Sequence, residues 1–254
     1  MDFQLRERVV LIVGPLTTTV QSLMSRLTDE GADVALLDSE AGKAEKFCSQ
    51  LTDQREIHAK HGRAMAVPVD FSQFGQIKDA ISRVAQTFGG IDAYIDAQVS
   101  NQPSPMVLDS QEFNFDELLN KNLKSTLLVT QAVAGFLKSR KKGRIIFLMN
   151  DSILRAQPED AFVSAVRGGL VPFTQALSKQ LLSHNVTVNV LTLGMTEEYL
   201  LAHTPGIPIK EVLEKLRQSD PYARITEPEK ITNSIIFLMG SSGAAVSGQL
   251  IRLV

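Results

Sequence analysis

Residues 9–38 read VVLIVGPLTTTVQSLMSRLTDEGADVALLD and decide the fold, because two apolar runs flank one segment of helical character. The first run, Val9–Val13, has the length and the β-branched content of a buried strand. A helix is predicted from Thr18 to Glu30, and Gly31 stands where a helix stop is expected. The second run, Asp33–Leu37, is again typical of a strand. The stretch therefore predicts a strand, a helix and a second strand, the unit from which parallel sheets are built.

The same alternation continues to the end of the chain. Further strands are predicted at Ala64–Val67, Ala93–Ile95, Arg144–Met149, Val186–Leu191 and Gln249–Val254. Further helices are predicted at Ala41–His58, Phe74–Phe88, Phe115–Ser139, Glu159–Ser183 and Pro228–Met239, with an inserted helical segment over Thr196–Tyr222. Pro172 is expected to bend the helix that contains it, because proline removes a backbone hydrogen bond. The pattern predicts one domain over residues 1–254, a doubly wound, Rossmann-like parallel sheet of about seven strands in three α/β/α layers.

The composition of the 254 residues excludes several classes of protein. With 44% hydrophobic and 21% charged residues, the chain is neither disordered nor fibrous. Its 26 Lys and Arg balance 28 Asp and Glu, so no general attraction to nucleic acid is expected. The single cysteine, Cys48, excludes an internal disulfide framework and a multi-cysteine zinc site. No apolar run is long enough to span a bilayer and the start is not a signal segment, so a cytoplasmic protein without membrane partners is expected.

Two weaker signals lead to no partner or metal. His58 and His61 stand three residues apart at a predicted helix end, but no third ligand is positioned, so a solvated surface is expected. Residues 138–144 hold five basic side chains in seven positions. They follow a helix end, where positive charge suits the dipole, and no aromatic residues are interleaved as in nucleic-acid sites.

A series of fragments resembles the short-chain dehydrogenase/reductase superfamily, in order and over nearly the whole chain. These fragments are Val10–Gly14, Gly31–Asp38, Val69-Asp70, Gly89–Asp92, Asn122, Gly143–Ile146, Arg167–Leu170, Val188–Val190 with Leu193-Gly194, Arg224–Ile231 and Ser247–Gln249. The resemblance implies a Rossmann-like fold, a nicotinamide dinucleotide and oxidoreductase chemistry. Each of these is an expectation to be compared with the residues present.

The phosphate-binding turn of that family, T-G-x-x-x-G-x-G, is reduced to Gly14. Thr18 and Val20 replace the second and third glycines. A β-branched residue where φ must be positive costs about 1–3 kcal/mol, so the turn must change shape. Two interpretations stay open: a capped helix without a phosphate site, or a helix N-terminus whose threonine hydroxyls still hold an anion.

Two acids fall where the resemblance implies cofactor contacts. Asp38 lies 24 residues after Gly14 and would bind a ribose hydroxyl, which favours NAD over NADP. Asp70 would contact the adenine. The alternatives are a polar strand end for Asp38 and a helix cap for Asp70. No cofactor is therefore predicted as the first interpretation, and NAD if one binds.

The fourth predicted strand also departs from the family. The family motif N-N-A-G is replaced by Asp96-Ala97-Gln98-Val99. A buried Asp96 requires a hydrogen-bond donor, and the sequence alone does not name one.

The catalytic set implied by the resemblance is absent. Counting from neighbouring motifs places Asn150 at the Ser position, Val163 at the Tyr position and Arg167 at the Lys position, while Asn122 matches the helix Asn. Valine donates no proton, and an arginine titrates too high to act as a base. None of the three tyrosines is followed by Lys at the fourth or the seventh position. The candidate catalytic residues are therefore Asn122, Asn150 and Arg167, without a phenol.

These losses predict a non-catalytic pseudoenzyme that acts as an assembly or regulatory module. Two alternatives stay open: an NAD-dependent oxidoreductase with displaced catalytic residues, and an NAD-binding sensor without chemistry. The resemblance implies a homo-oligomer, dimer or tetramer, or a mixed oligomer with a related chain. The predicted helices near 115–139 and 159–183 and the C-terminal strand would form the contacts.

Overall fold

The computed structural model describes residues 3–57, 61–99, 107, 114–155, 160–219 and 223–253. These residues contain a parallel sheet of seven strands in the order β3-β2-β1-β4-β5-β6-β7. The strands are β1 Val9–Val13, β2 Asp33–Asp38, β3 Ala64–Pro68, β4 Ala93–Asp96, β5 Arg144–Asn150, β6 Thr187–Leu193 and β7 Leu250–Leu253. The predicted doubly wound, Rossmann-like sheet is therefore confirmed.

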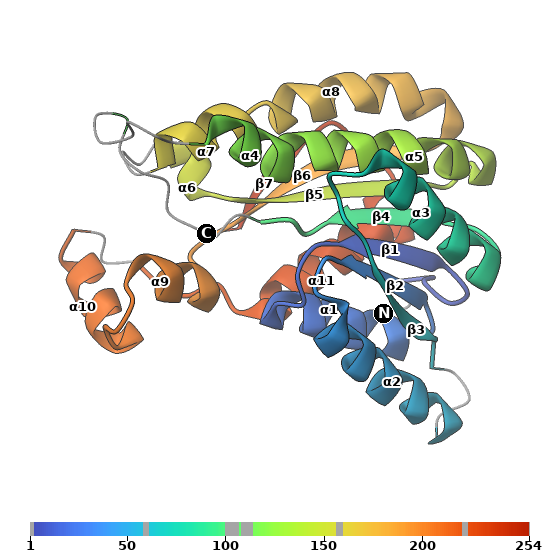
Figure 1. Ribbon diagram of the computed structural model, residues 1–254, viewed down its shortest axis with the longest axis horizontal. Helices are drawn as coiled ribbons and strands as arrows, with labels where there is room; N and C mark the ends of the chain where they lie inside the picture. Colours follow the sequence, from blue (N-terminus) through green and yellow to red (C-terminus); the bar gives the residue numbers. More distant parts are fainter. Residues whose placement is uncertain are drawn as a thin grey trace.

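Helices cover both faces of the sheet and make the three predicted layers (Figure 1). One face is covered by α3 Phe74–Phe88, α5 Ser125–Arg140 and α8 Leu170–Leu181, and the other by α1 Thr18–Asp29, α2 Ala41–Ile57 and α11 Pro228–Met239. Val9 and Leu11 of β1 pack into the first layer, whereas Val10 and Ile12 pack into the second. Both faces of β1 are buried, which is why its sequence is apolar throughout.

Most shorter elements lie in the segments that follow the carboxyl ends of β4, β5 and β6, while η4 and η5 each join a long helix to the strand that follows it. The shorter elements are α4 Phe115–Leu119, the π-helical turn η2 Asn120–Lys124, α6 Ser152–Arg155, α7 Ala161–Arg167, η4 Leu182–His184, α9 Glu197–His203, α10 Ile209–Ser219 and η5 Ser241–Gly243. The helix predicted over 115–139 is thus interrupted by a π-turn, which no local pattern indicates. The inserted segment predicted over 196–222 consists of α9 and α10 in its described part.

The single helix predicted over Glu159–Ser183 is wrong, because α7 and α8 are separate helices. The break falls at Gly168 and Gly169, and a Cβ on Gly168 would lie 2.5 Å from the Ser164 carbonyl oxygen. Pro172 lies in the first turn of α8, where a missing N–H leaves no gap in the helical ladder. The bend expected at Pro172 is therefore replaced by a break ahead of it.

Two side chains singled out in the sequence are buried. His61 is 6% exposed and its Nε2 lies 3.0 Å from Asp29 Oδ1, so the solvated surface expected there is wrong for His61, while His58 lies outside the described residues. Cys48 of α2 is buried, and burial, followed by the charge of Glu45, raises the pKa of its thiol to about 12. Among the described residues, no group of three His, Cys, Asp or Glu is arranged to hold a metal ion. Within the same residues, every helix is too short or too polar to cross a membrane.

The order of the strands reverses at β1, which has β2 on one side and β4 on the other. Val13 pairs with Leu37 of β2 and with Asp96 of β4. Ligands of doubly wound sheets bind outside the carboxyl ends of the strands at such a reversal. Figure 1 shows α6, α7 and α9 at this same end of the sheet. The candidate site is therefore sought there.

Candidate cofactor and active site

The turn after β1 keeps a glycine because two strand ends meet there. Gly14 has φ of +141°, and a Cβ would lie 2.6 Å from the carbonyl carbon and oxygen of Ala97. Its N–H donates to the Leu37 carbonyl oxygen at 3.0 Å. Thr17 then caps α1, accepting a hydrogen bond from the Val20 N–H at 3.2 Å. Gly14 is thus required by the approach of β4, whatever ligand the turn holds.

Of the two acids predicted to contact the cofactor, Asp38 is the last residue of β2 and Asp70 lies two residues after β3. Asp38 is 4% exposed, and its carboxylate accepts hydrogen bonds from the N–H groups of Leu16 at 3.2 Å and Glu40 at 3.0 Å. Asp70 is exposed and accepts a hydrogen bond from the Ser72 N–H at 2.9 Å. Hydrogen bonds from Ser72 lower the pKa of Asp70. The three predicted cofactor residues therefore lie at or just beyond the ends of three adjacent strands.

The N-terminus of α1 already holds a carboxylate. The Thr18 N–H donates to Glu198 Oε1 at 3.0 Å, and the Thr18 hydroxyl donates to the same oxygen. Glu198 belongs to α9, which follows β6 and lies 180 residues further along the chain. The first turn of α1 has no acidic residue of its own. The positive end of this helix is therefore neutralised from a distant segment.

The end of β4 is a buried polar cluster. Asp96 is fully buried and accepts hydrogen bonds from the Thr126 hydroxyl and from the Gln98 N–H, the latter at 2.8 Å. The Gln98 side-chain oxygen accepts a hydrogen bond from the Ser125 hydroxyl at 3.1 Å. The donors that the sequence could not name for Asp96 thus come from the first turn of α5 and from its own loop.

The residue at the Lys position joins two segments of the core. Arg167 is fully buried, and its guanidinium donates to the carbonyl oxygens of Asn122 at 3.0 Å and Leu148 at 2.8 Å. Burial lowers the pKa of Arg167, and the charge of Asp96 opposes that shift. Asn150 ends β5 and is 4% exposed, while Val163 of α7 packs into the core. Arg167 and Asn122 are therefore in contact.

The two tyrosines among the described residues, Tyr94 and Tyr199, differ in burial and in their neighbours. Tyr94 is fully buried, and desolvation, followed by the charge of Asp96, raises its pKa well above the usual value. Tyr199 is half-buried on α9, and its hydroxyl donates to Asp160 Oδ2 at 3.4 Å. The His203 ring stacks on the Tyr199 ring with centroids 3.9 Å apart. Asp160 immediately precedes α7, so a phenol absent from α7 itself approaches that helix from α9.

A charge network missed by sequence reasoning ties the last strand to this end of the sheet. Asp151 is 2% exposed and accepts hydrogen bonds from Arg155 at 2.7 Å, from Arg252 at 2.7 and 2.8 Å, and from the Thr192 hydroxyl at 3.1 Å. Burial raises the pKa of Asp151, but hydrogen bonds led by those from Arg252 and Arg155 outweigh it, so the pKa lies below the usual value.

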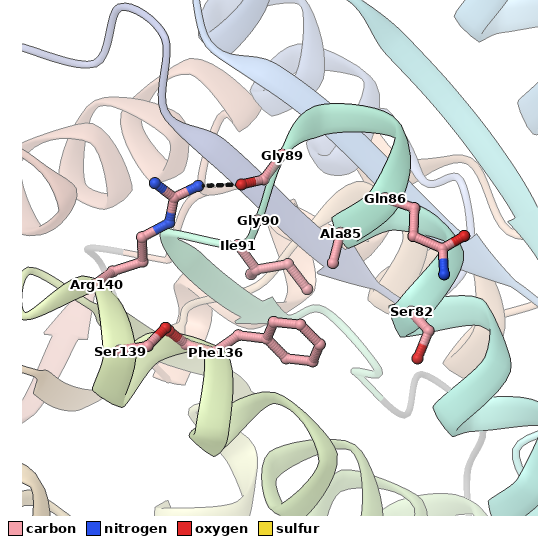
Figure 2. Close-up of a pocket in the computed structure, with 9 residues that line it drawn as sticks. All are labelled: Ser82, Ala85, Gln86, Gly89, Gly90, Ile91, Phe136, Ser139 and Arg140. Atoms are coloured by element: carbon pink, nitrogen blue, oxygen red, sulfur yellow. Dashed lines mark hydrogen bonds between the residues drawn. The ribbon is translucent and has the colours of Figure 1, made fainter.

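A pocket of about 390 Å³ lies at the other end of the sheet. It is lined by α3, α5 and the loop before β4, and Figure 2 shows Arg140 donating to the Gly89 carbonyl oxygen at its rim. The side chain of Phe136 forms part of its wall (Figure 2). This pocket lies beside the loop that leads into β4, away from the carboxyl end where the site residues are found.

A sequence profile of the family described as Enoyl-(Acyl carrier protein) reductase matches residues 22–253. The chain belongs to this family and, with it, to the short-chain dehydrogenase/reductase superfamily. The match begins after residues 14–20, the segment compared above with the phosphate-binding turn.

Individual relatives agree with this class over nearly the full length. The chain is 27% identical to the (2S)-[(R)-hydroxy(phenyl)methyl]succinyl-CoA dehydrogenase subunit BbsD of Thauera aromatica, over 97% of this chain and 95% of that protein. It is 26% identical to an NADPH-dependent aldehyde reductase-like protein of Arabidopsis thaliana, over 96% and 92%. A 3-ketoacyl-(acyl-carrier-protein) reductase from Brucella melitensis complexed with NADH superposes with a TM-score of 0.80 at 21% identity, covering 98% of each chain, which shows the shared fold.

These comparisons contradict the first interpretation of the sequence, a non-catalytic assembly module. Relatives that align with nearly the whole chain are named dehydrogenases or reductases. That interpretation depended on missing motif residues, and a missing local motif does not exclude groups supplied by other segments. The alternative, an NAD-dependent oxidoreductase, agrees better with the relatives.

Proposed function

We propose that this chain is an NAD-dependent oxidoreductase that interconverts a carbonyl group and an alcohol, and that it works without the family's Ser, Tyr and Lys. The observation that carries the proposal is the pair of Thr18 donors, which hold an anionic group at the point where the strand order reverses. The same pair of donors suits a phosphate of a dinucleotide.

The residues present fit such a cofactor once the Glu198 carboxylate leaves Thr18. A carboxylate offers about four lone-pair sites, and Asp38 uses two on backbone N–H groups, so it retains the capacity to accept from a ribose hydroxyl. Its negative charge opposes a 2′-phosphate and favours NAD over NADP. Gly14 allows the turn to pass close to β4. When bound, the cofactor supplies or accepts a hydride.

Tyr199 is proposed as the proton donor in place of Val163. A phenol is the only neutral side chain of this cluster with an acidic hydroxyl, and Asp160 holds it against the start of α7. Stacking on His203 fixes the ring plane. Tyr199 would give a proton to the carbonyl oxygen during reduction and recover it during oxidation.

The predicted catalytic residues are given supporting roles. Arg167 keeps a permanent positive charge behind the site and holds the carbonyl oxygen of Asn122 in the π-turn. Asn150, at the end of β5, is proposed to hold the substrate oxygen with its side-chain amide, the task that the resemblance assigns to Ser. Neither role requires Arg167 or Asn150 to transfer a proton.

The test combines binding and turnover on the purified full-length chain. Titration calorimetry with NADH and NADPH measures affinity, and absorbance at the nicotinamide band follows turnover with aldehydes and 3-oxoacyl thioesters, the substrate classes in the relatives' names. Tyr199→Phe is expected to lower kcat by about 10²–10⁴ and to leave NADH affinity unchanged. The control is Tyr94→Phe, since the Tyr94 hydroxyl is fully enclosed and should not affect kcat. Full turnover by Tyr199→Phe would exclude Tyr199 as the donor, and a wild-type chain that turns over no substrate with either cofactor would refute the function.

The proposal extends to assembly and location. We propose a dimer or tetramer, of this chain alone or with a related chain, acting in the cytoplasm. Exposed apolar side chains support association: Leu182 is 64% exposed beyond α8, and Phe237 is 42% exposed on α11. The name of the Thauera aromatica relative includes the word subunit. Light scattering of the purified chain, with and without a co-expressed relative, measures the assembly.

A further inference from the structure

Glu198 holds the donors that the proposed function assigns to the cofactor. Both polar hydrogens of Thr18, on the backbone nitrogen and on the hydroxyl, point to one carboxylate oxygen. The neighbouring Leu16 N–H is held by Asp38, and the Val20 N–H by Thr17. Two acids and one cap thus hold the donors of Leu16, Thr18 and Val20, and Glu198 is the acid that comes from a distant segment.

A phosphate and this carboxylate cannot occupy the same donors together. Both are anions attracted to the positive end of α1, and each needs the Thr18 N–H and hydroxyl. Like charges in contact repel, so one group must leave before the other binds. Asp38 does not compete in this way, because its donors lie on the preceding turn and on the loop after β2.

The rest of α9 is held independently of the Glu198 carboxylate. Leu200 is buried at 3% exposure, and the Tyr199 hydroxyl contacts Asp160. The backbone is fixed just before the helix, where the Met195 carbonyl oxygen accepts a hydrogen bond from the Thr226 N–H at 2.7 Å. Rotation of the Glu198 side chain alone therefore frees Thr18, while α9 and Tyr199 stay in place.

We infer that Glu198 is a built-in competitor that occupies the phosphate subsite at the α1 N-terminus and must be displaced for a dinucleotide to bind. The inference rests on the proposed function and deepens it. The intramolecular carboxylate lowers the apparent affinity for the cofactor, because the binding-competent state is only the fraction in which Glu198 has rotated away. The Glu198 carboxylate also provides a hydrogen-bond acceptor for the Thr18 N–H and hydroxyl in the unliganded protein.

The experiment measures binding of NADH and of inorganic pyrophosphate to the full chain by calorimetry. Glu198→Ala is expected to tighten both by roughly tenfold, the upper range for one charge at a helix end. Glu198→Gln keeps the shape without the charge and should fall between wild type and Glu198→Ala. The matched control is Glu197→Ala, which removes the exposed neighbouring acid of the same helix and should leave both affinities unchanged.

The outcomes separate this inference from the function on which it rests. Equal NADH affinity in wild type and Glu198→Ala refutes the competitor and leaves the function standing. Tighter pyrophosphate binding by Glu198→Ala, with no NADH binding by any variant, supports the competitor and refutes the function. Binding of neither probe by any variant refutes both. A loss of affinity in Glu198→Ala also overturns the inference, because it would make Glu198 a ligand.

Discussion

Arg167 shows how one buried charge can organise the end of a sheet. Its guanidinium bridges the π-turn at Asn122 and strand β5 at Leu148, and the nearby charge of Asp96 offsets part of its desolvation. A π-turn leaves backbone carbonyl groups without their usual helical partners, and an arginine has enough donors in a fixed fork to satisfy two carbonyl groups at once. A lysine lacks this fixed fork of donors, so it would hold the two carbonyl groups less well.

Replacement of Arg167 is expected to destabilise the fold strongly. Arg167→Met should lower the free energy of unfolding by about 2–4 kcal/mol, because two buried carbonyl groups lose their donors and Asp96 loses a compensating charge. Urea unfolding followed by circular dichroism measures the change. Arg26→Lys, at an exposed pair with Glu30, should alter stability by less than about 0.5 kcal/mol. If Arg167→Met left the free energy of unfolding almost unchanged, water would be taking the place of the guanidinium.

At the scale of elements, local pattern was enough for the strands and failed at helix interruptions. The strands β1, β4, β5 and β6 are buried along their whole length, and their apolar runs are a local signal. The edge strands β3 and β7 are only partly buried. The π-turn at 120–124 has no such signal, because it depends on Arg167 reaching it from another helix. The sequence predicts one helix that bends at Pro172, whereas the structure has two helices separated at Gly168 and Gly169.

The turn between β1 and α1 provides a test at this scale. Gly14→Ala should destabilise the chain by about 1–3 kcal/mol or more, since φ is positive and the new methyl group would meet the Ala97 backbone. Thermal unfolding without ligand measures this effect. Gly42→Ala in α2 is the matched change, because no atom lies near its Cβ, and it should stabilise by about 0.5–1 kcal/mol. If Gly14→Ala and Gly42→Ala changed the stability equally, the backbone between β1 and β4 would have moved apart to make room for the new methyl group.

At the scale of the whole molecule, the contacts that define the site join distant parts of the sequence. The positions of Asp38 and Asn150 follow from strand order, because strand ends in a parallel sheet meet at one edge. The contacts of Glu198 with Thr18 and of Tyr199 with Asp160 do not, because they depend on where α9 packs. No spacing rule relates residues 180 positions apart, so these contacts could be found only from the structure.

The Asp151 network makes global stability depend on pH. Its folded pKa lies below the unfolded value, so it contributes stability above the unfolded pKa, and that contribution is lost as pH falls through the folded pKa. Asp151→Asn should therefore be less stable than wild type at pH 7, and the difference should shrink as pH falls below about 4. Urea unfolding across a pH series measures it, with Asp79→Asn on the exposed face of α3 as control. A difference that does not vary with pH would contradict the assignment.

The buried thiol of Cys48 supplies a reporter for all these variants. With a pKa near 12 it carries almost no thiolate at pH 8 while the chain is folded, so a chromogenic disulfide reagent reacts only when α2 opens. The rate at which the coloured product is released then measures how often α2 opens. Because the chain has a single cysteine, native protein carries its own label, and each substitution can be ranked by labelling kinetics without further engineering.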